Sequence, residues 1–132
     1  MLLHDYNLIT HQIIKCAIEV HKHLGPGLME SVYDVCLFKE LESIGLHVER
    51  QKVLPVTYKG QVLHKDFVID QLVENEIILE LKSIDGILPV HDAQLLTYLK
   101  LADKKLGLLI NFNVPVLKDG IRRKINGNLT RK

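Results

Sequence analysis

The stretch from residue 106 to residue 112, Leu-Gly-Leu-Leu-Ile-Asn-Phe, is almost continuously apolar over the length of one β-strand. Such a run suits a strand that is buried on both faces, as in sheets that carry helices on either side. A helical pattern over residues 90–102 precedes it, and a helix that crosses over between two strands of a sheet is typical of α/β folds. These segments therefore predict an α/β fold with a helical crossover before the last core strand.

Five further segments complete the predicted core. Two have the apolar period of helices and are separated by Gly-Pro-Gly at residues 25–27, and three read as strands, the first with a bulge or an edge position at Pro55. The helices are expected over residues 8–24 and 28–44, and the strands over residues 48–58, 62–73 and 76–83. This order predicts a mixed central sheet that is built on hairpins and flanked by helices. Because no repeat or linker interrupts the chain, residues 1–132 are expected to form one domain with its core at about residues 8–125.

The composition is that of a globular domain: 47% of the 132 residues are hydrophobic, 25% are charged and the formal net charge is +1. These values exclude a disordered or collagen-like chain, and near-neutrality argues against a broad polyanion binder. No run of 18 apolar residues predicts a membrane span, and no signal peptide is recognised at the N-terminus. Cys16 and Cys36 lie in helical patterns rather than in C-x-x-C pairs. This predicts buried free thiols, a reducing compartment and hence a cytoplasmic location.

Positive charge is concentrated at the C-terminal end. Residues 118–132, here called the basic tail, have a net charge of +5 from Asp119 and six basic residues: Lys118, Arg122, Arg123, Lys124, Arg131 and Lys132. Blocks of this kind bind nucleic-acid phosphates, but chain ends of this composition are also commonly solvated and frayed. The sequence leaves both interpretations open.

Two carboxylates on neighbouring strands are the main candidates for chemistry. Glu80 and Lys82 share one face of their strand, and Asp70 shares a face with Val68 and Leu72. A two-residue turn at positions 74–75 would place Asp70 and Glu80 on opposite sides of the sheet. A three-residue loop at positions 74–76 would place Asp70 opposite Glu80 and Val68 opposite Lys82. We predict the three-residue loop.

Carboxylates that face each other across two strands repel unless a positive charge lies between them. A hard divalent cation such as Mg²⁺ or Mn²⁺ meets that need. Lys82 could then orient or deprotonate a water on the metal, or neutralise charge that develops on a phosphate. The plainer alternative is a pair of surface charges, but Glu80 and Lys82 follow the apolar residues 77–79, which indicates a central strand rather than a solvated edge.

Two helices contribute further candidates. Glu30 falls on the same helical stripe as the apolar Leu37 and Leu41, so it needs a cation, a donor or a water-lined cavity, unless it emerges at the edge of the packed face. Gln94 and Tyr98 are four residues apart and share one helix face. Tyr98 could equally be a packed aromatic residue with its hydroxyl at the surface.

Several motifs, in order, resemble those of one known family. They are the G-x-x-E-x-x-Y signature at residues 27–33, Tyr58-Lys59-Gly60, Asp70, Glu80-Leu81-Lys82, Gln94-Leu95-Leu96-Thr97-Tyr98-Leu99 and Gly107-Leu108-Leu109-Ile110-Asn111-Phe112. The sequence resembles the GxxExxY proteins over residues 8–125. That family is similar to a small branch of the PD-(D/E)XK nuclease superfamily, whose restriction-endonuclease-like αβββαβ core agrees with the order of elements above.

The resemblance implies roles for four charged residues. Asp70 and Glu80 would be the metal-binding acids, Lys82 the catalytic lysine, and Glu30 a further metal-binding acid from the helical region, as in the RecB-like exonuclease branch.

The resemblance also concerns positions around those acids. Gln94 and Tyr98 match the Q-x-x-x-Y motif of that branch and would touch substrate or support the lysine. Relatives commonly have a basic residue two positions before the aspartate, where this sequence has Val68. The absence of that cation bears on a phosphate contact at this point but not on metal binding. Asp66 is a rival first acid, although Asp70 fits Glu80 and Lys82 better in register and spacing.

The function implied is that of a Mg²⁺- or Mn²⁺-dependent nuclease that acts on nucleic acid, with DNA favoured over RNA and no membrane partner. The alternative is a module of the same fold that binds nucleic acid or a partner without turnover. Because the chain has little beyond the core, a homodimer or a partner protein could complete it.

Overall fold

A computed structural model describes residues 1–129 of the chain, without the side chain of His64. Its elements, in chain order, are α1 (Leu3–Leu24), α2 (Glu30–Ser43), β1 (Val48–Tyr58), β2 (Gln61–Val73), β3 (Ile77–Lys82), α3 (Pro89–Ala102), β4 (Leu106–Asn111), the 3₁₀ helix η1 (Leu117–Gly120) and β5 (Ile121–Ile125). The predicted order of helices and strands is confirmed. Helix α1 begins five residues before the predicted start, where the Asp5 carboxylate accepts a hydrogen bond from the backbone N–H of Leu2 at 3.0 Å.

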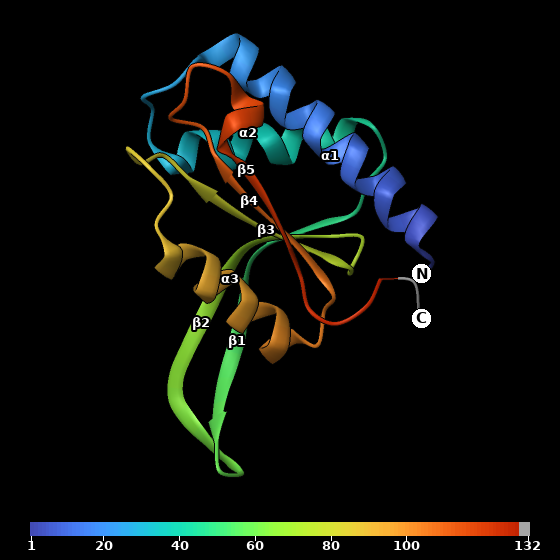
Figure 1. Cartoon of the computed structure of the whole chain (residues 1–132), viewed down its shortest axis with the longest axis vertical. Helices are drawn as coiled ribbons and strands as arrows, with labels where there is room; N and C mark the ends of the chain where they lie inside the picture. The colour runs from blue at the N-terminus through green and yellow to red at the C-terminus, as the bar shows by residue number, and fades with distance from the viewer. Residues whose placement is uncertain (130–132) are drawn as a thin grey trace.

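The described strands form one five-stranded sheet in the order β1-β2-β3-β4-β5. Strands β3 and β4 are parallel and the other neighbouring pairs are antiparallel, so the sheet is mixed, as predicted. Helix α3 makes the crossover between the two parallel strands. Figure 1 shows α1 and α2 together on one side of the sheet and α3 on the other.

Each face of the sheet has its own core. The alternation in β3 sends Ile77, Leu79 and Leu81 into the core beneath α1 and α2, and Ile78 into the core beneath α3. All six residues of β4 are buried, as its apolar run predicts. The centre of the sheet is therefore buried on both faces, and the polar residues of β3 extend from this packed region.

Over residues 118–125 the basic tail is folded onto the domain, and binding of phosphates by its cations stays a prediction. Residues 117–120 form η1, and β5 pairs with β4 in the register Ile110↔Ile121. Arg122 and Lys124 both reach Asp92 on α3, at 3.0 and 3.2 Å. The expectation of a frayed end is thus wrong for this part, because strand pairing and these ion pairs hold it on the domain. Arg131 and Lys132 lie outside the described residues.

Strands β1 and β2 form a long hairpin that extends beyond the rest of the sheet (Figure 1). Lys59 and Gly60 make its turn, both with positive φ, and the register shifts next to Pro55 on this edge strand, as predicted. The outer part of this hairpin, residues 52–69, is here called the arm.

A kink separates the arm from the sheet. Pairs Arg50↔Gln71 and Lys52↔Ile69 flank it, and Gln51 between them has a φ of 52°, a left-handed conformation that is costly for a residue with a side chain. Beyond the kink Ile69 packs into the α3 core, although it is an odd number of residues from Leu72 in the same core.

The kink overturns one detail of the predicted register. Val68 does not lie opposite Lys82, because it belongs to the arm, where it pairs with Val53 and is exposed. The strand changes the face it presents to the core at the kink, so strict alternation fails there.

Both cysteines are free thiols, as predicted, with Cys16 buried and Cys36 half-buried. Within residues 1–129, none of the helices has the length and apolar character needed to cross a bilayer.

Candidate active site

The register of β2 and β3 brings the two predicted acids together. The pairs Gln71↔Leu79, Leu72↔Ile78 and Val73↔Ile77 enclose the three-residue loop at positions 74–76, which confirms the predicted loop. The regular pairing stops at Gln71, and Asp70 and Glu80 are the next residues on the two strands. The acids therefore lie in the fork where β2 separates from β3.

Each acid binds the backbone of the opposite strand. The backbone N–H of Asp70 donates to Glu80 Oε2 at 2.9 Å, and the N–H of Leu81 donates to Asp70 Oδ2 at 2.7 Å. Each carboxylate uses one oxygen in this way, and the other oxygen has no hydrogen-bond partner within residues 1–129. Two fixed carboxylates thus keep an oxygen available for a ligand.

Burial makes this pair of charges unfavourable. Burial, and then the charge of Asp70, raise the pKa of Glu80 from 4.5 to about 8. Burial is also the main cause that raises the pKa of Asp70, with Asp34 and Glu30 adding to it. A divalent cation that takes oxygen ligands would relieve this repulsion, so the donor set of Asp70 and Glu80 fits Mg²⁺ or Mn²⁺.

Lys82 lies at the end of β3 and is half-buried. Alternation along β3 puts it on the same face as Glu80, and its charge lowers the pKa of both Asp70 and Glu80. It forms no ion pair within 4.0 Å among the described residues. Its charge therefore acts on the site without being neutralised by one carboxylate.

Of the two predicted residues on helix α3, one is buried and one is exposed. Tyr98 is buried, and its ring packs against Phe67 with the ring centroids 5.2 Å apart. Burial raises the pKa of its hydroxyl, and so do the charges of Glu80 and Asp70. The Gln94 side chain is exposed and makes no hydrogen bond within the described part of the chain.

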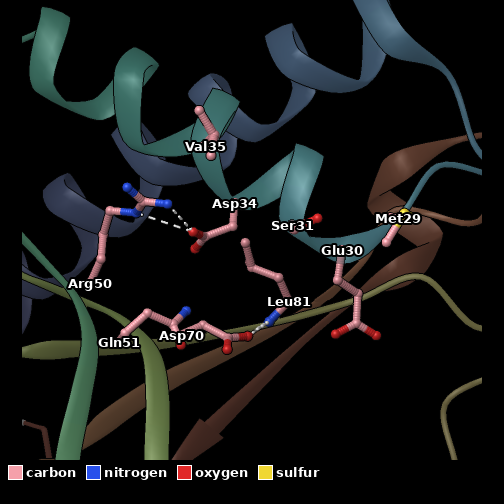
Figure 2. Close-up of a pocket in the computed structure, with 9 residues that line it drawn as sticks. All are labelled: Met29, Glu30, Ser31, Asp34, Val35, Arg50, Gln51, Asp70 and Leu81. Carbon is pink, nitrogen blue, oxygen red and sulfur yellow. Dashed lines mark hydrogen bonds and ion pairs between the residues drawn. The ribbon is translucent and has the colours of Figure 1, made fainter.

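A cavity of about 710 Å³ opens beside the fork, between the N-terminus of α2 and strands β1 to β3. Figure 2 shows Glu30 and Asp34 reaching toward it from α2, with Asp70 below them. Glu30 is the first residue of α2 and is exposed, so its stripe does not carry it into the core. It lines the cavity instead, which agrees with both expectations for it: a carboxylate that faces a cavity and one that emerges at the edge of the packed face.

The acids do not form a larger metal-binding cluster. Over residues 1–129, no three His, Cys, Asp or Glu side chains gather closely enough to hold a metal ion. Glu30 raises the pKa of Asp70 and Glu80, but it does not join them as a third ligand in this arrangement. Its role as a metal ligand stays a prediction.

The sequence interpretation missed a polar cluster on the cavity wall. Arg50 Nη2 and Nε donate to Asp34 Oδ2 at 2.6 and 3.1 Å, and the fully buried Gln71 amide donates to Asp34 Oδ1 and to its backbone carbonyl, each at 2.9 Å. Asp34 could have been found because it follows Glu30 by four residues and so shares its helix face. No sequence pattern predicts the position of Arg50, because that position depends on the kink at Gln51.

The tyrosine of the G-x-x-E-x-x-Y signature supports the loop before Glu30. The Tyr33 hydroxyl donates to the carbonyl of Gly25 at 2.6 Å and accepts from the N–H of Leu28 at 3.1 Å. Its ring stacks on Phe112, with the centroids 4.4 Å apart. Tyr33 thereby fixes the loop that leads into α2 and sets where Glu30 stands.

Comparison with known proteins gives one match. The family model described as the PD-(D/E)XK nuclease superfamily matches residues 7–124 of the chain. No curated protein and no solved structure matches the chain significantly.

Proposed function

The chain belongs to the PD-(D/E)XK nuclease superfamily, and from this premise we propose that it hydrolyses phosphodiester bonds of nucleic acid with Mg²⁺ or Mn²⁺. The observation that carries the proposal is the pair Asp70 and Glu80, whose carboxylates are fixed by backbone donors and each keep one oxygen without a hydrogen-bond partner within residues 1–129. The pKa of both acids is raised, and Asp70 lines the cavity; acids of raised pKa at a cavity are typical of catalytic centres.

Asp70 and Glu80 would hold the ion. A divalent cation in such a site supplies Lewis-acid chemistry, because it polarises a phosphate and lowers the pKa of water. Lys82 is placed to neutralise negative charge on the phosphate that is attacked, or to orient the attacking water. Its ammonium is free for this role, since no carboxylate among the described residues pairs with it.

The remaining candidates have supporting roles in this proposal. Glu30 adds a carboxylate to the cavity wall, where it can orient water. Tyr98 packs against Phe67, the charges of both acids raise the pKa of its hydroxyl, and it can touch substrate or support Lys82. Gln94, one helical turn earlier, is exposed and available to substrate rather than to the acids.

We also propose the finer assignments that the motifs imply: the GxxExxY family, the RecB-like branch and a DNA substrate. A cytoplasmic location and a homodimer or partner protein remain predictions. The two free thiols agree with a reducing compartment.

Cleavage assays test the proposal directly. Purified protein is incubated with single-stranded DNA, double-stranded DNA and RNA, each with Mg²⁺ or Mn²⁺. Asp70→Ala and Lys82→Ala should each lower the rate roughly 100-fold or more. Asp66→Ala is the matched control, because Asp66 lies on the same strand but in the exposed arm, and it should cleave as the wild type does. Activity that survives both Asp70→Ala and Lys82→Ala would refute the assignment.

A module that binds nucleic acid or a partner without turnover is the second candidate. One observation favours it: within residues 1–129 no three side chains form a ready metal cluster. Calorimetric titration with Mn²⁺ separates the two, since a catalytic site should bind the ion and Glu80→Ala should abolish the binding.

A further inference from the structure

The cavity beside the acids has one wall with a positive charge. Of the described residues that line it, Glu30, Asp34 and Asp70 are acids, and Arg50 alone is basic. A polyanionic strand that enters this cavity meets repulsion from the acids and attraction from one guanidinium. The placement of Arg50 therefore decides where a phosphate can rest.

The guanidinium of Arg50 is held in a fixed orientation. Two of its N–H groups donate to a single oxygen of Asp34, and its carbon lies 4.8 Å from the centroid of the Phe38 ring. Asp34 is itself fixed, because the buried Gln71 amide binds its other oxygen and its carbonyl. A side chain ordered in advance loses little conformational entropy when it binds a ligand.

Arg50 also keeps donors for a ligand. Of the five N–H groups of a guanidinium, the two that bind Asp34 leave three without a partner in the described part of the chain. The side chain is 34% exposed and lines the cavity, so it is open to a ligand there rather than enclosed in the core. Planar, paired donors of this kind match the geometry of a phosphate.

The backbone beside Arg50 gives an independent indication. Gln51 has a φ of 52° at the kink, opposite Asp70, and it also lines the cavity. Such a conformation costs about 1–3 kcal/mol and is concentrated at functional sites. Figure 2 shows Arg50 and Glu30 on either side of Asp34, with Asp70 beneath.

We propose that Arg50 binds a phosphate of the substrate other than the one that is cleaved, and that Asp34 is the positioning residue that holds it there. The substrate strand then runs along the cavity from Arg50 to the Asp70 and Glu80 pair. This inference rests on the proposed function, since it needs a nucleic-acid strand in the same site.

The experiment measures cleavage and binding separately. Steady-state cleavage of a labelled single-stranded DNA gives kcat and KM. Fluorescence anisotropy gives binding of the same DNA to the Lys82→Ala protein with Mg²⁺, across a range of salt concentrations. Arg50→Ala should raise KM and the dissociation constant by about 10- to 100-fold, as loss of a charged hydrogen bond does, with kcat within about twofold. The slope of log affinity against log salt should become shallower by about one unit, which corresponds to the loss of one phosphate contact.

Further variants separate this role from a structural one. Arg50→Gln keeps a donor for Asp34 and should lose binding like Arg50→Ala, whereas Arg50→Lys should restore part of it. Asp34→Asn keeps the arginine charge but loosens its position, so it should raise KM less than Arg50→Ala does. Lys52→Ala is the matched control, because Lys52 lies on the same strand and also pairs with an acid, Glu49, outside the cavity lining; its KM and salt slope should not change.

The outcomes distinguish the two proposals. If the wild type cleaves DNA and Asp70→Ala abolishes cleavage, but Arg50→Ala and Arg50→Gln leave KM and the salt slope unchanged, the role of Arg50 is overturned and the nuclease function stands. If the wild type neither cleaves nor binds any nucleic acid, both are overturned.

Discussion

The side chains of Asp70 and Glu80 bind backbone N–H groups at the position where the backbone pairing of β2 with β3 ends. The Glu80 carboxylate accepts from the backbone N–H of Asp70 at 2.9 Å, and the Asp70 carboxylate accepts from the residue after Glu80 at 2.7 Å. The strands can therefore separate at this point without leaving these two N–H groups unpaired. The same contacts hold both carboxylates in the fork between β2 and β3. The candidate metal site therefore lies at the point where the pairing of these two strands ends.

The first prediction concerns pH and stability in the absence of metal. The pKa of Glu80 is raised from 4.5 to about 8, so the folded protein binds a proton that the unfolded chain releases over that interval. The stabilisation is fully present below pH 4.5 and is lost as the pH rises toward 8. With EDTA present, the Tm should fall by at least about 5 °C between pH 5 and pH 8.

Thermal unfolding of Glu80→Gln checks the cause. This variant should lose most of the pH-dependent fall and should be more stable than the wild type at pH 8. Glu42→Gln, at an exposed position on α2, should follow the wild-type profile. A wild-type Tm that rises between pH 5 and pH 8 would contradict the prediction.

The second prediction concerns the metal. Because Glu80 must lose its proton to bind a cation, Mn²⁺ affinity should increase about tenfold between pH 6 and pH 7, with one proton released per ion. Calorimetry in two buffers of different ionisation enthalpy measures the released proton directly. Asp66→Asn should behave as the wild type, whereas a pH-independent affinity would mean that Glu80 is not a ligand.

The pairing of the two acids could be predicted from sequence, because it depends on local features. A three-residue loop and the period of two in each strand decide which residues face each other, and β2 and β3 follow both rules up to Gln71. Lys82 follows from the same alternation. The helices and the crossover follow from apolar periods and from glycine positions.

The cavity wall could not be predicted in this way. A left-handed residue is usually glycine or asparagine, and Gln51 gives no such signal. Alternation therefore placed Val68 beside Lys82, although it lies in the arm. Similarly, β5 could not be predicted, because three consecutive cations do not show the pattern of a strand. Their partners Asp92 and Asn7 lie far away in the chain.

The third prediction concerns the support of Glu30. Tyr33→Phe keeps the ring that stacks on Phe112 but removes the hydroxyl that binds Gly25 and Leu28. The free energy of unfolding should fall by about 1–2 kcal/mol, and cleavage should weaken because Glu30 follows this loop directly. Urea unfolding measures the change. Tyr58→Phe, at an exposed tyrosine of the arm, is the control; an equal effect of both variants would show that the Tyr33 hydroxyl holds nothing.

The fourth prediction concerns the packing of η1 against the end of β4. A methyl group on Gly120 would overlap the backbone oxygen of Asn111 and come within 3.1 Å of Val114 Cγ2. Backbone cannot yield as a flexible side chain does, so Gly120→Ala should lower the free energy of unfolding by about 1–3 kcal/mol.

The cost should extend to the candidate active site. The side chain of Asn111 binds the backbone of Ile84, at 3.0 and 3.1 Å, in the loop that follows Lys82. If Gly120→Ala displaces Asn111, the end of β3 moves with it and the cleavage rate falls. Gly86→Ala is the matched control in that loop, since an added methyl group there meets nothing within 4 Å. Equal urea midpoints for the two alanine variants would mean that the close approach of Gly120 to β4 does not constrain the fold.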